Sequence, residues 1–164
     1  MRATQVREVL QSWRDAERRW EATHPDDPDY EQVRNAVAEP WLAYQEASGS
    51  VAADELVLVA DDRMRYVAAN ETAHRVLGYP SGGLIGRSIA DVTAPGDVEA
   101  AAAAWATFLR LGRLDGEYRL VTADGRAVPV VYLARAHQPV AGLHVSRLRV
   151  IAPTPSEQHT SGAG

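Results

Sequence analysis

The sequence predicts an α+β fold, in which two helices precede an antiparallel sheet. Three observations lead to this expectation. Apolar residues recur at helical spacing through residues 1–47, and two short strand-like runs follow within residues 56–69. Three further strand-like runs then close the chain after a long helix at 97–111. Helices and strands therefore occupy separate stretches, which is typical of α+β rather than alternating α/β domains.

The first 47 residues are expected to form two amphipathic helices. Apolar residues recur every three or four positions in each of them, at Val6, Val9, Leu10, Trp13 and Trp20, and at Tyr30, Val33, Val37, Trp41 and Tyr44. Asp27 and Pro28 together form a start signal for the second helix. Pro40 falls within that helix and should interrupt it near 36–39. These apolar faces must be buried, either against the sheet or in self-association.

The stretch from Leu56 to Leu77 is expected to hold a strand pair and a short helix. Leu56–Ala60 is an apolar run typical of a strand covered on both faces, and Met64–Ala69 follows after a polar turn. Asn70 can cap a helix over Glu71–Leu77, because its side chain accepts from backbone N–H groups there. Gly78 is the residue type that best adopts the left-handed conformation of a helix end.

The remaining elements follow from similar signals. A turn through Leu84 and Gly86 and a short helix at Ser88–Val92 precede the long helix, which carries five alanines at 100–104 and ends at Gly112. Asp124-Gly125 predicts a hairpin turn between two strands. The strand at 127–136 has apolar residues at both odd and even positions, so both of its faces should be covered. The N-terminal helices are the available cover for the outer face.

The order of these parts resembles a PAS domain, a sensory and interaction fold common in bacterial signalling proteins. The resemblance rests on Asn70, on Gly78-Tyr79 and on the L-I-G-R-S run at Leu84–Ser88, and it covers Leu56–Ile151. It implies a five-stranded antiparallel sheet with short helices on one face, preceded by the N-terminal helical pair. We therefore expect a helical extension and linker at 1–50, a PAS domain at 51–151 and a disordered tail at 152–164.

Composition limits the chemistry of the chain. It has 164 residues, 46% of them hydrophobic, a net charge of −5 and no cysteine. Its acidity argues against nucleic acid as a partner, and the sequence contains no membrane-length apolar run or signal peptide, so we expect a cytoplasmic protein. No histidine stands at metal-ligand spacing with carboxylates, and we expect no metal site.

No catalytic constellation is visible, and we do not expect an enzyme. Asp61 and Asp62 resemble the acidic pair of a phosphoacceptor domain, but the chain has no lysine to accompany them and they are interpreted as turn residues. The PAS resemblance implies that haem would need a histidine on the long helix, which has none. A covalent flavin or coumaroyl chromophore would need a cysteine, which is absent. A non-covalent flavin, a small carboxylate, an apolar metabolite or a packed core all remain open.

The expected function is therefore that of a bacterial signalling module. The last strand runs into Ala152-Pro153 instead of an output helix, so we expect a free-standing PAS protein that acts by association, as a homodimer or with a signalling partner. The alternative is a small-molecule sensor. Its predicted pocket residues are Tyr66, Ala102, Ala103, Trp105, Tyr118, Tyr132, His144 and Ser146. The predicted dimer interface comprises Val6, Leu10, Trp13, Trp20, Val37, Trp41 and Tyr44.

Overall fold

The computed structural model describes residues 2–151, and the tail at 152–164 that we predicted to be disordered lies outside them. Its helices are α1 (Arg2–Glu21), α2 (Tyr30–Asn35), α3 (Ala38–Ala47), α4 (Glu71–Leu77), η1 (Ala90–Val92), η2 (Pro95–Asp97) and α5 (Val98–Leu111). Its strands are β1 (Leu56–Asp61), β2 (Tyr66–Ala69), β3 (Arg113–Val121), β4 (Ala127–Arg135) and β5 (Leu143–Val150).

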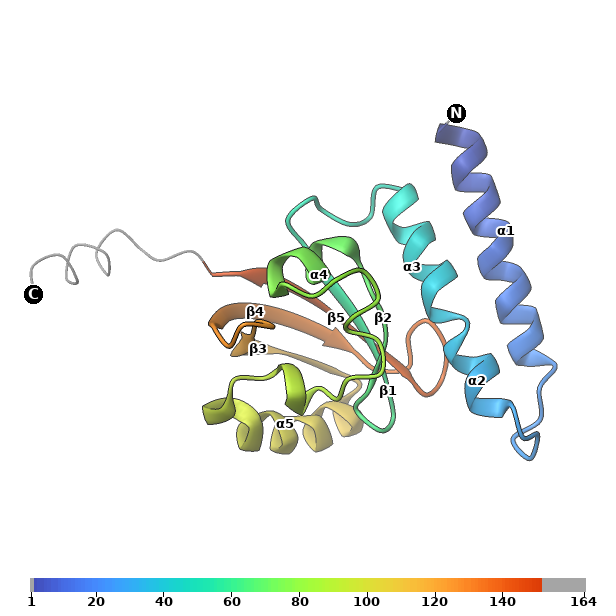
Figure 1. Ribbon diagram of the computed structural model, residues 1–164. Coiled ribbons are helices and arrows are strands. Elements are labelled where there is room, and N and C mark those ends of the chain that lie inside the picture. Colours follow the sequence, from blue (N-terminus) through green and yellow to red (C-terminus); the bar gives the residue numbers. More distant parts are fainter. Residues whose placement is uncertain (1, 152–164) are drawn as a thin grey trace, which may run out of the picture.

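The five strands form one antiparallel sheet in the order β2-β1-β5-β4-β3. β1 pairs with β2 on one side and with β5 on the other, so the first and last strands of the sheet lie side by side (Figure 1). β3, β4 and β5 follow one another as a meander. The predicted α+β fold with a five-stranded antiparallel sheet is therefore confirmed.

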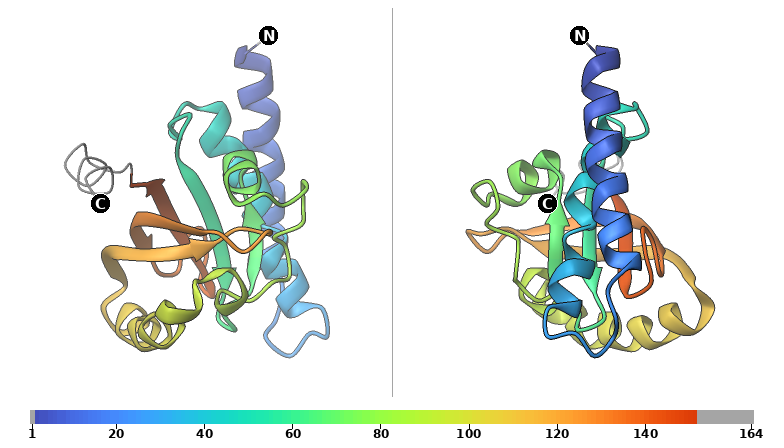
Figure 2. Two further views of the ribbon diagram at one scale, coloured as in Figure 1. Left: turned by 60° about the vertical axis from the view of Figure 1, so that its left-hand side comes forward. Right: turned by 90° about the vertical axis from the view of Figure 1, so that its right-hand side faces the viewer.

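The sheet separates two hydrophobic cores, which explains why every residue of β1 is buried. On the inner face, Leu56 and Leu58 pack with residues from α4, the turns that follow it and the later strands. On the outer face, Val57 and Val59 pack against Ala38, Trp41 and other residues of the N-terminal helices. Figures 1 and 2 show these two layers, with α4 and α5 on one side of the sheet and α1 to α3 on the other.

Asn70 joins the sheet to the helices of the inner face. Its side-chain oxygen accepts from the N–H of Ala73 at 3.0 Å, which is the predicted helix cap. The same oxygen accepts from the N–H of Val57 at 3.1 Å, while the N–H of Asn70 donates to the carbonyl of Val57 at 3.0 Å. Asn70 thus continues the β1–β2 ladder for one more residue. At the other end of α4, Gly78 has the predicted left-handed conformation, with φ of 77°.

The N-terminal helices fold back as a hairpin, with α1 packed along α3 and α3 packed on the sheet. The predicted interruption before Pro40 is confirmed, because the chain leaves the α-helix between Asn35 and Ala38. Pro40 then lies in the first turn of α3, where its missing N–H costs nothing. The predicted start at Pro28 is wrong. α2 begins at Tyr30, and the Asp27 carboxylate instead accepts from the N–H of His24 at 2.9 Å.

The outer face of β4 is more open than its sequence predicted. The helices reach β1, β2 and the start of β5, and Val131 on β4 remains 43% exposed. The prediction that the helical pair covers this strand is therefore wrong for Val131. Pro129 is tolerated within β4 because pairing with β5 begins one residue later, at Val130 with Val150.

Candidate functional site

A cavity of about 90 Å³ lies between the inner face of the sheet and α5. α5 supplies one wall, and β1, β4 and β5 supply the opposite one. The lining residues are Leu58, Ala60, Met64, Tyr66, Ile89, Ala101, Ala104, Trp105, Phe108, Leu114, Tyr118, Tyr132, Ala134, His144, Val145 and Ser146. The wall is therefore mostly hydrocarbon, with a few hydroxyl groups and one imidazole.

Six of the eight predicted pocket residues line this cavity, namely Tyr66, Trp105, Tyr118, Tyr132, His144 and Ser146. The prediction is wrong for Ala102 and Ala103, which are exposed on the far side of α5. Ala101 and Ala104 line the cavity in their place. These two positions lie one turn apart on one helix face, together with Trp105 and Phe108. A run of five alanines contains no periodic signal that could have shown which members face inward.

His144 stands in the cavity wall with both ring nitrogens already engaged. Its Nδ1 accepts from the backbone N–H of His137 at 3.1 Å, so the proton of the neutral ring lies on Nε2. Nε2 then donates to Oδ1 of Asp62 at 2.7 Å. Burial lowers the pKa of His144 below its usual value, against the opposing effect of Asp62, and keeps the ring neutral near pH 7.

The ring of His144 also packs against two aromatic side chains that line the cavity. It meets the rings of Trp105 and Phe108 edge to face, at centroid distances of 5.3 Å and 5.8 Å. The ring of His137 lies 4.9 Å away on the other side, so the two histidines pack on each other across their hairpin. His144 therefore presents ring carbons to the cavity and no free nitrogen.

Asp62 connects the hydrogen bond from His144 to the N-terminal helices. Its second oxygen, Oδ2, lies 3.9 Å from Nη1 of Arg34, a residue of α2 whose side chain is only 8% exposed. Arg34 in turn packs against Gly142, where an added Cβ would stand 2.9 Å from its guanidinium. This connection could not be predicted from the sequence, because Arg34 sits among surface-type residues and lies far from Asp62 in the chain. Asp61 is the last residue of β1, and its carboxylate accepts from the N–H groups of Arg63 and Arg65 across the predicted turn, in which Asp62 lies.

The remaining polar groups of the cavity are neutral hydroxyls. Burial raises the pKa of Tyr66 and of Tyr118, so both phenols stay protonated. Tyr118 and Tyr132 meet edge to face at 5.2 Å. No Arg, Asp or Glu lines the cavity, and within residues 2–151 no hydrogen bond joins Ser146 to a base. The wall is suited to holding a neutral molecule, and it lacks an activated nucleophile.

The predicted dimer residues lie in three different settings. Val37 and Trp41 are buried between α3 and the sheet, so that they are not available at a dimer interface as predicted. Trp13 packs on Tyr44 at 5.3 Å, and Trp20 packs on Tyr30 at 4.6 Å, which joins α1 to its own neighbours.

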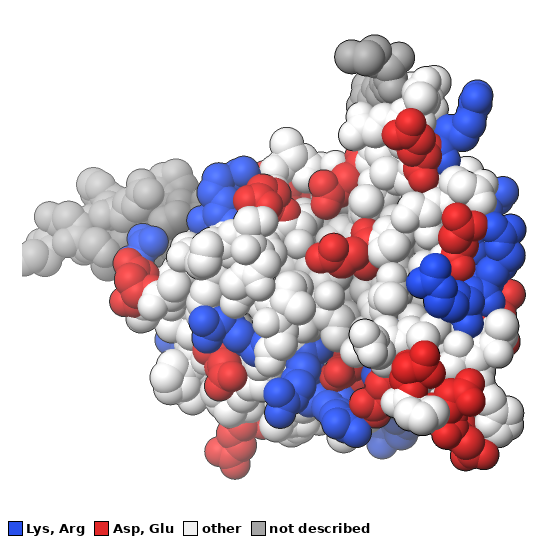
Figure 3. Space-filling model, turned by 45° about the vertical axis from the view of Figure 1, so that its right-hand side comes forward, with Lys and Arg blue, Asp and Glu red and all other residues white. Residues whose placement is uncertain are grey.

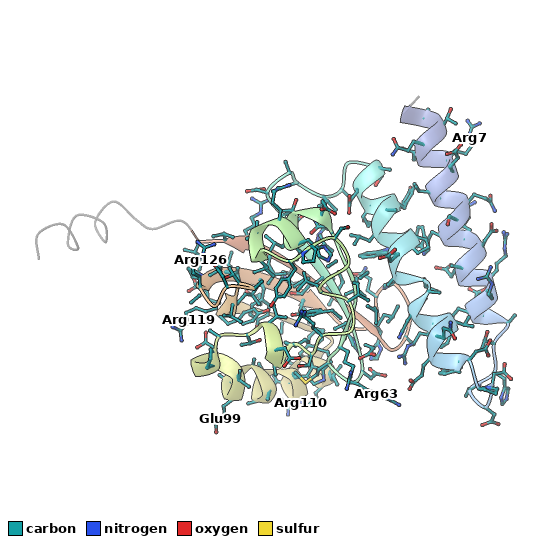
Figure 4. All side chains as sticks on the ribbon, viewed as in Figure 1. Arg7, Arg63, Glu99, Arg110, Arg119 and Arg126 are labelled. Carbon is teal, nitrogen blue, oxygen red and sulfur yellow. The ribbon has the colours of Figure 1, made fainter. Side chains whose placement is uncertain are left out.

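Val6 and Leu10 are half-buried on the first turns of α1, which extend beyond the end of α3 in Figures 1 and 2. Arg7 projects from the same end of the helix in Figure 4.

The described part of the chain offers neither a metal site nor a membrane span. Among residues 2–151, no three His, Asp or Glu side chains gather to hold a metal ion. No helix within the same range has both the length and the apolar character needed to cross a membrane.

Comparison with solved structures shows what the fold is similar to. A PAS domain from Colwellia psychrerythraea matches with a TM-score of 0.57 and 18% identity, covering 67% of this chain and 97% of that one. Drosophila melanogaster Cycle PAS-B, solved with bound ethylene glycol, matches with a TM-score of 0.53 and 14% identity, over 58% of this chain and 99% of that one.

A third match is the PAS domain of a LuxR-family transcriptional regulator from Burkholderia thailandensis, solved in complex with ethanol. Its TM-score is 0.51 at 16% identity, and the match covers 62% of this chain and 92% of that one. No curated protein matches the chain. The family model described as "PAS fold" matches residues 52–142, more than half of the chain. The chain therefore belongs to the PAS family, whose domains serve in sensing and signalling.

Proposed function

We propose that this protein is a cytoplasmic bacterial signalling module that acts through protein association and is regulated by a small neutral molecule bound beneath α5. The chemistry of the cavity wall carries the proposal. Aromatic and aliphatic groups supply most of the surface, and three tyrosine hydroxyls and Ser146 supply the polar groups. This combination, an apolar pocket with a few convergent polar groups, is typical of small-molecule sites. The role is one of sensing rather than catalysis.

The size of the cavity favours a very small ligand over a flavin. An engineered protein cavity of about 150 Å³ holds one benzene molecule. The cavity here measures about 90 Å³, less than that, and a three-ring flavin would require much of the core to move. A compact molecule of a few heavy atoms fits this volume.

The charge of the wall favours a neutral ligand over a small carboxylate. A buried anion needs a cation or several donors to replace its lost hydration. The cavity has no arginine, and His144 is neutral and already donates its proton to Asp62. Alcohols and other neutral molecules with one or two oxygens avoid this cost. Two of the similar PAS structures hold ethylene glycol and ethanol, which supports the same ligand class.

An NMR titration with ethanol and with ethylene glycol tests this proposal. Ethanol has three heavy atoms and gains at most about 4.5 kcal/mol, so its dissociation constant should be no tighter than about 0.5 mM. Ethylene glycol has four and gains at most about 6 kcal/mol, so the corresponding bound is about 40 µM. Ala104→Leu should fill the cavity and abolish the shifts of its neighbours. Ala102→Leu is the matched control, because the same side chain then points to solvent. Shifts that persist in Ala104→Leu would place the ligand elsewhere and contradict the proposal.

Mass spectrometry under native conditions identifies the natural ligand. The protein should be purified from its own host and sprayed without denaturation. We expect an added mass that corresponds to a few heavy atoms and is lost in Ala104→Leu. An added mass the size of a flavin would contradict the size argument above.

The association half of the proposal is a homodimer, and α1 is its first candidate surface. Val6, Val9 and Leu10 are only half-buried at the free end of this helix. The rest of the helical layer is shown in Figure 3, where acidic and basic side chains are interspersed. Partly exposed apolar residues among such charges favour a partner that covers them.

Light scattering of the full chain measures this association. We expect a dimer in the wild type, and a shift toward monomer in Leu10→Glu. Deletion of residues 1–47 is unsuitable, because it would also uncover the outer core beneath Val37 and Trp41. Arg7→Glu places a carboxylate on the exposed side of the same turns and serves as a control. A wild-type protein that stays monomeric would refute the homodimer.

A further inference from the structure

A groove of about 170 Å³ lies on the outer face of the sheet, at the edge of the helical layer. α3 forms one side of it through Trp41 and Gln45, which stand one helical turn apart on the same helix face. β4 and β5 form the floor, and the turn between these strands contributes Gln138. The groove therefore lies on the opposite side of the sheet from α5.

The lining of the groove combines an apolar floor with cationic and amide groups. Leu133 and Val145 join Trp41 as its apolar surface, and all three are at least partly buried. Arg135 and Arg147 are its two ionisable side chains, and no Asp or Glu among residues 2–151 lines the groove with them. Such a lining suits a molecule with a hydrocarbon part and an anionic end.

The register of the sheet brings arginines together at this groove. Leu133 pairs with Arg147 and Arg135 pairs with Val145, so the two arginines are diagonal neighbours on one face, with Cβ atoms about 7–8 Å apart. Arg113 on β3 stands directly opposite Arg135. Like charges in directly opposite positions repel each other. Neither of these two exposed arginines forms an ion pair within residues 2–151.

Nearby carboxylates balance only part of this charge. Oε1 of Glu55 lies 3.2 Å from Nη2 of Arg147, and Asp115 on β3 stands opposite Leu133. Three arginines and two carboxylates on this part of the face leave one positive charge in excess. A monoanion matches this excess, whereas a dianion such as a phosphate monoester would exceed it.

The hydrogen bonding of Arg147 is also incomplete. Its Nη2 donates to the carbonyl of Ser50 and contacts Glu55, but its Nε is buried and has no acceptor within residues 2–151. A buried N–H group without an acceptor lowers stability. A carboxylate in the groove would provide an acceptor beside this side chain after a small rotation of the guanidinium.

We propose that this groove binds a small organic monocarboxylate. The carboxylate contacts the guanidinium of Arg135, and the hydrocarbon part of the ligand lies on Trp41 and Leu133. The volume of about 170 Å³ exceeds the roughly 150 Å³ of an engineered cavity that holds one benzene molecule, so a ligand of the size of benzoate fits. This site differs in place and in ligand charge from the cavity of the proposed function, and the two can be tested separately.

An NMR titration with sodium benzoate at constant ionic strength tests this site. Trp41 lines the groove and Trp105 lines the cavity beneath α5, so the indole N–H signals of the two tryptophans report on the two sites separately. Nine heavy atoms at the binding efficiency of drug-sized molecules predict a dissociation constant of about 10 mM or tighter. Benzamide has the same shape without the charge and should bind at least about fivefold more weakly.

Arg135→Glu provides the matching change in the protein. Arg135 is exposed and has no ion pair in the described part of the chain, so the substitution should leave the fold intact. It should weaken benzoate binding by more than about tenfold, because it replaces attraction by repulsion. Arg149→Glu is the matched control. It changes the net charge by the same amount at an exposed position of β5 outside the groove lining, and should alter the affinity by less than about twofold.

The possible outcomes distinguish this site from the cavity. Ala104→Leu fills the cavity and should leave benzoate binding at Trp41 unchanged. Benzoate shifts at Trp105 that vanish in Ala104→Leu but persist in Arg135→Glu would place the anion in the cavity and overturn the groove site. Equal binding of benzamide and benzoate, or equal weakening by Arg135→Glu and Arg149→Glu, would also overturn it. The absence of any shift at Trp41 up to about 50 mM benzoate would do the same, while the ethanol titration of the cavity would be unaffected.

Discussion

Replacement of Asn70 by alanine tests whether one side chain holds the sheet and the inner helices together. The amide makes three hydrogen bonds from a nearly fully buried position. Its oxygen accepts from the N–H groups of Val57 and Ala73, and its nitrogen donates to the carbonyl of Glu55 at 2.8 Å. Alanine fills no hydrogen-bonding role, so Asn70→Ala removes all three together.

The expected loss follows from these three contacts. Removing the helix cap costs about 1 kcal/mol. The N–H of Val57 is left buried without a partner, which costs about 1–3 kcal/mol. The carbonyl of Glu55 lies in a part-buried position and regains a water molecule, so it adds little. We therefore expect Asn70→Ala to lower the free energy of unfolding by about 2–4 kcal/mol, a large share of the roughly 5–15 kcal/mol of a small domain.

Urea denaturation followed by tryptophan fluorescence measures this loss. Glu71→Ala changes the next residue, which is exposed, and should stay within about 0.5 kcal/mol of wild type. Asn70→Asp keeps the acceptor for both N–H groups but turns an oxygen toward the carbonyl of Glu55. Its loss in free energy of unfolding should lie between those of Glu71→Ala and Asn70→Ala. A loss of about 1 kcal/mol or less in Asn70→Ala would show that only the cap matters and would refute the junction.

Two further predictions concern the contacts around Asp62. Gly142→Ala should destabilise the protein more than Gly49→Ala, as measured by urea denaturation. Both glycines have a left-handed backbone, but only at Gly142 does the new Cβ collide with Arg34, and equal losses would contradict that contact. The lowered pKa of His144 means that protonation favours the unfolded chain. The stability contributed by the neutral His144 ring is therefore fully present above about pH 6.5 and is lost as the pH falls through the pKa of the folded state. The stability difference between wild type and His144→Asn should shrink from pH 7 to pH 5, and a constant difference would contradict a buried neutral ring.

Local signals in the sequence predicted most of the inner half of the fold. The Asn70 cap, the α4 helix and the Gly78 end depend on contacts within a few residues, and each was confirmed. The paired strands were recognisable from alternation and from the Asp124-Gly125 turn. The cavity residues on strands followed from the same alternation, because a strand has only two faces.

The errors arose where the sequence carries no local signal. Five alanines in succession give no indication of which side of α5 faces the sheet. The prediction therefore placed Ala102 and Ala103 in the cavity wall, where the structure has Ala101 and Ala104. Val131 is as apolar as its buried neighbours, and only the tertiary position of α3 decides that it stays exposed. Arg34 and Asp62 meet through the path of the whole chain, a contact that periodicity does not encode.

The contact between His144, Asp62 and Arg34 gives the two halves of the proposed function a physical connection. His144 stands in the cavity wall, and Arg34 belongs to the helical layer on the opposite face of the sheet. Because both ring nitrogens of His144 are engaged, a ligand that tilts the ring must stretch its hydrogen bond to Asp62. Asp62 would then be free to move toward the buried Arg34, whose one other side-chain contact of this kind within residues 2–151 is a hydrogen bond from Nε to the Asn35 side chain. A ligand in the cavity would thus displace α2 first, through Arg34, before it displaces any other part of the helical layer.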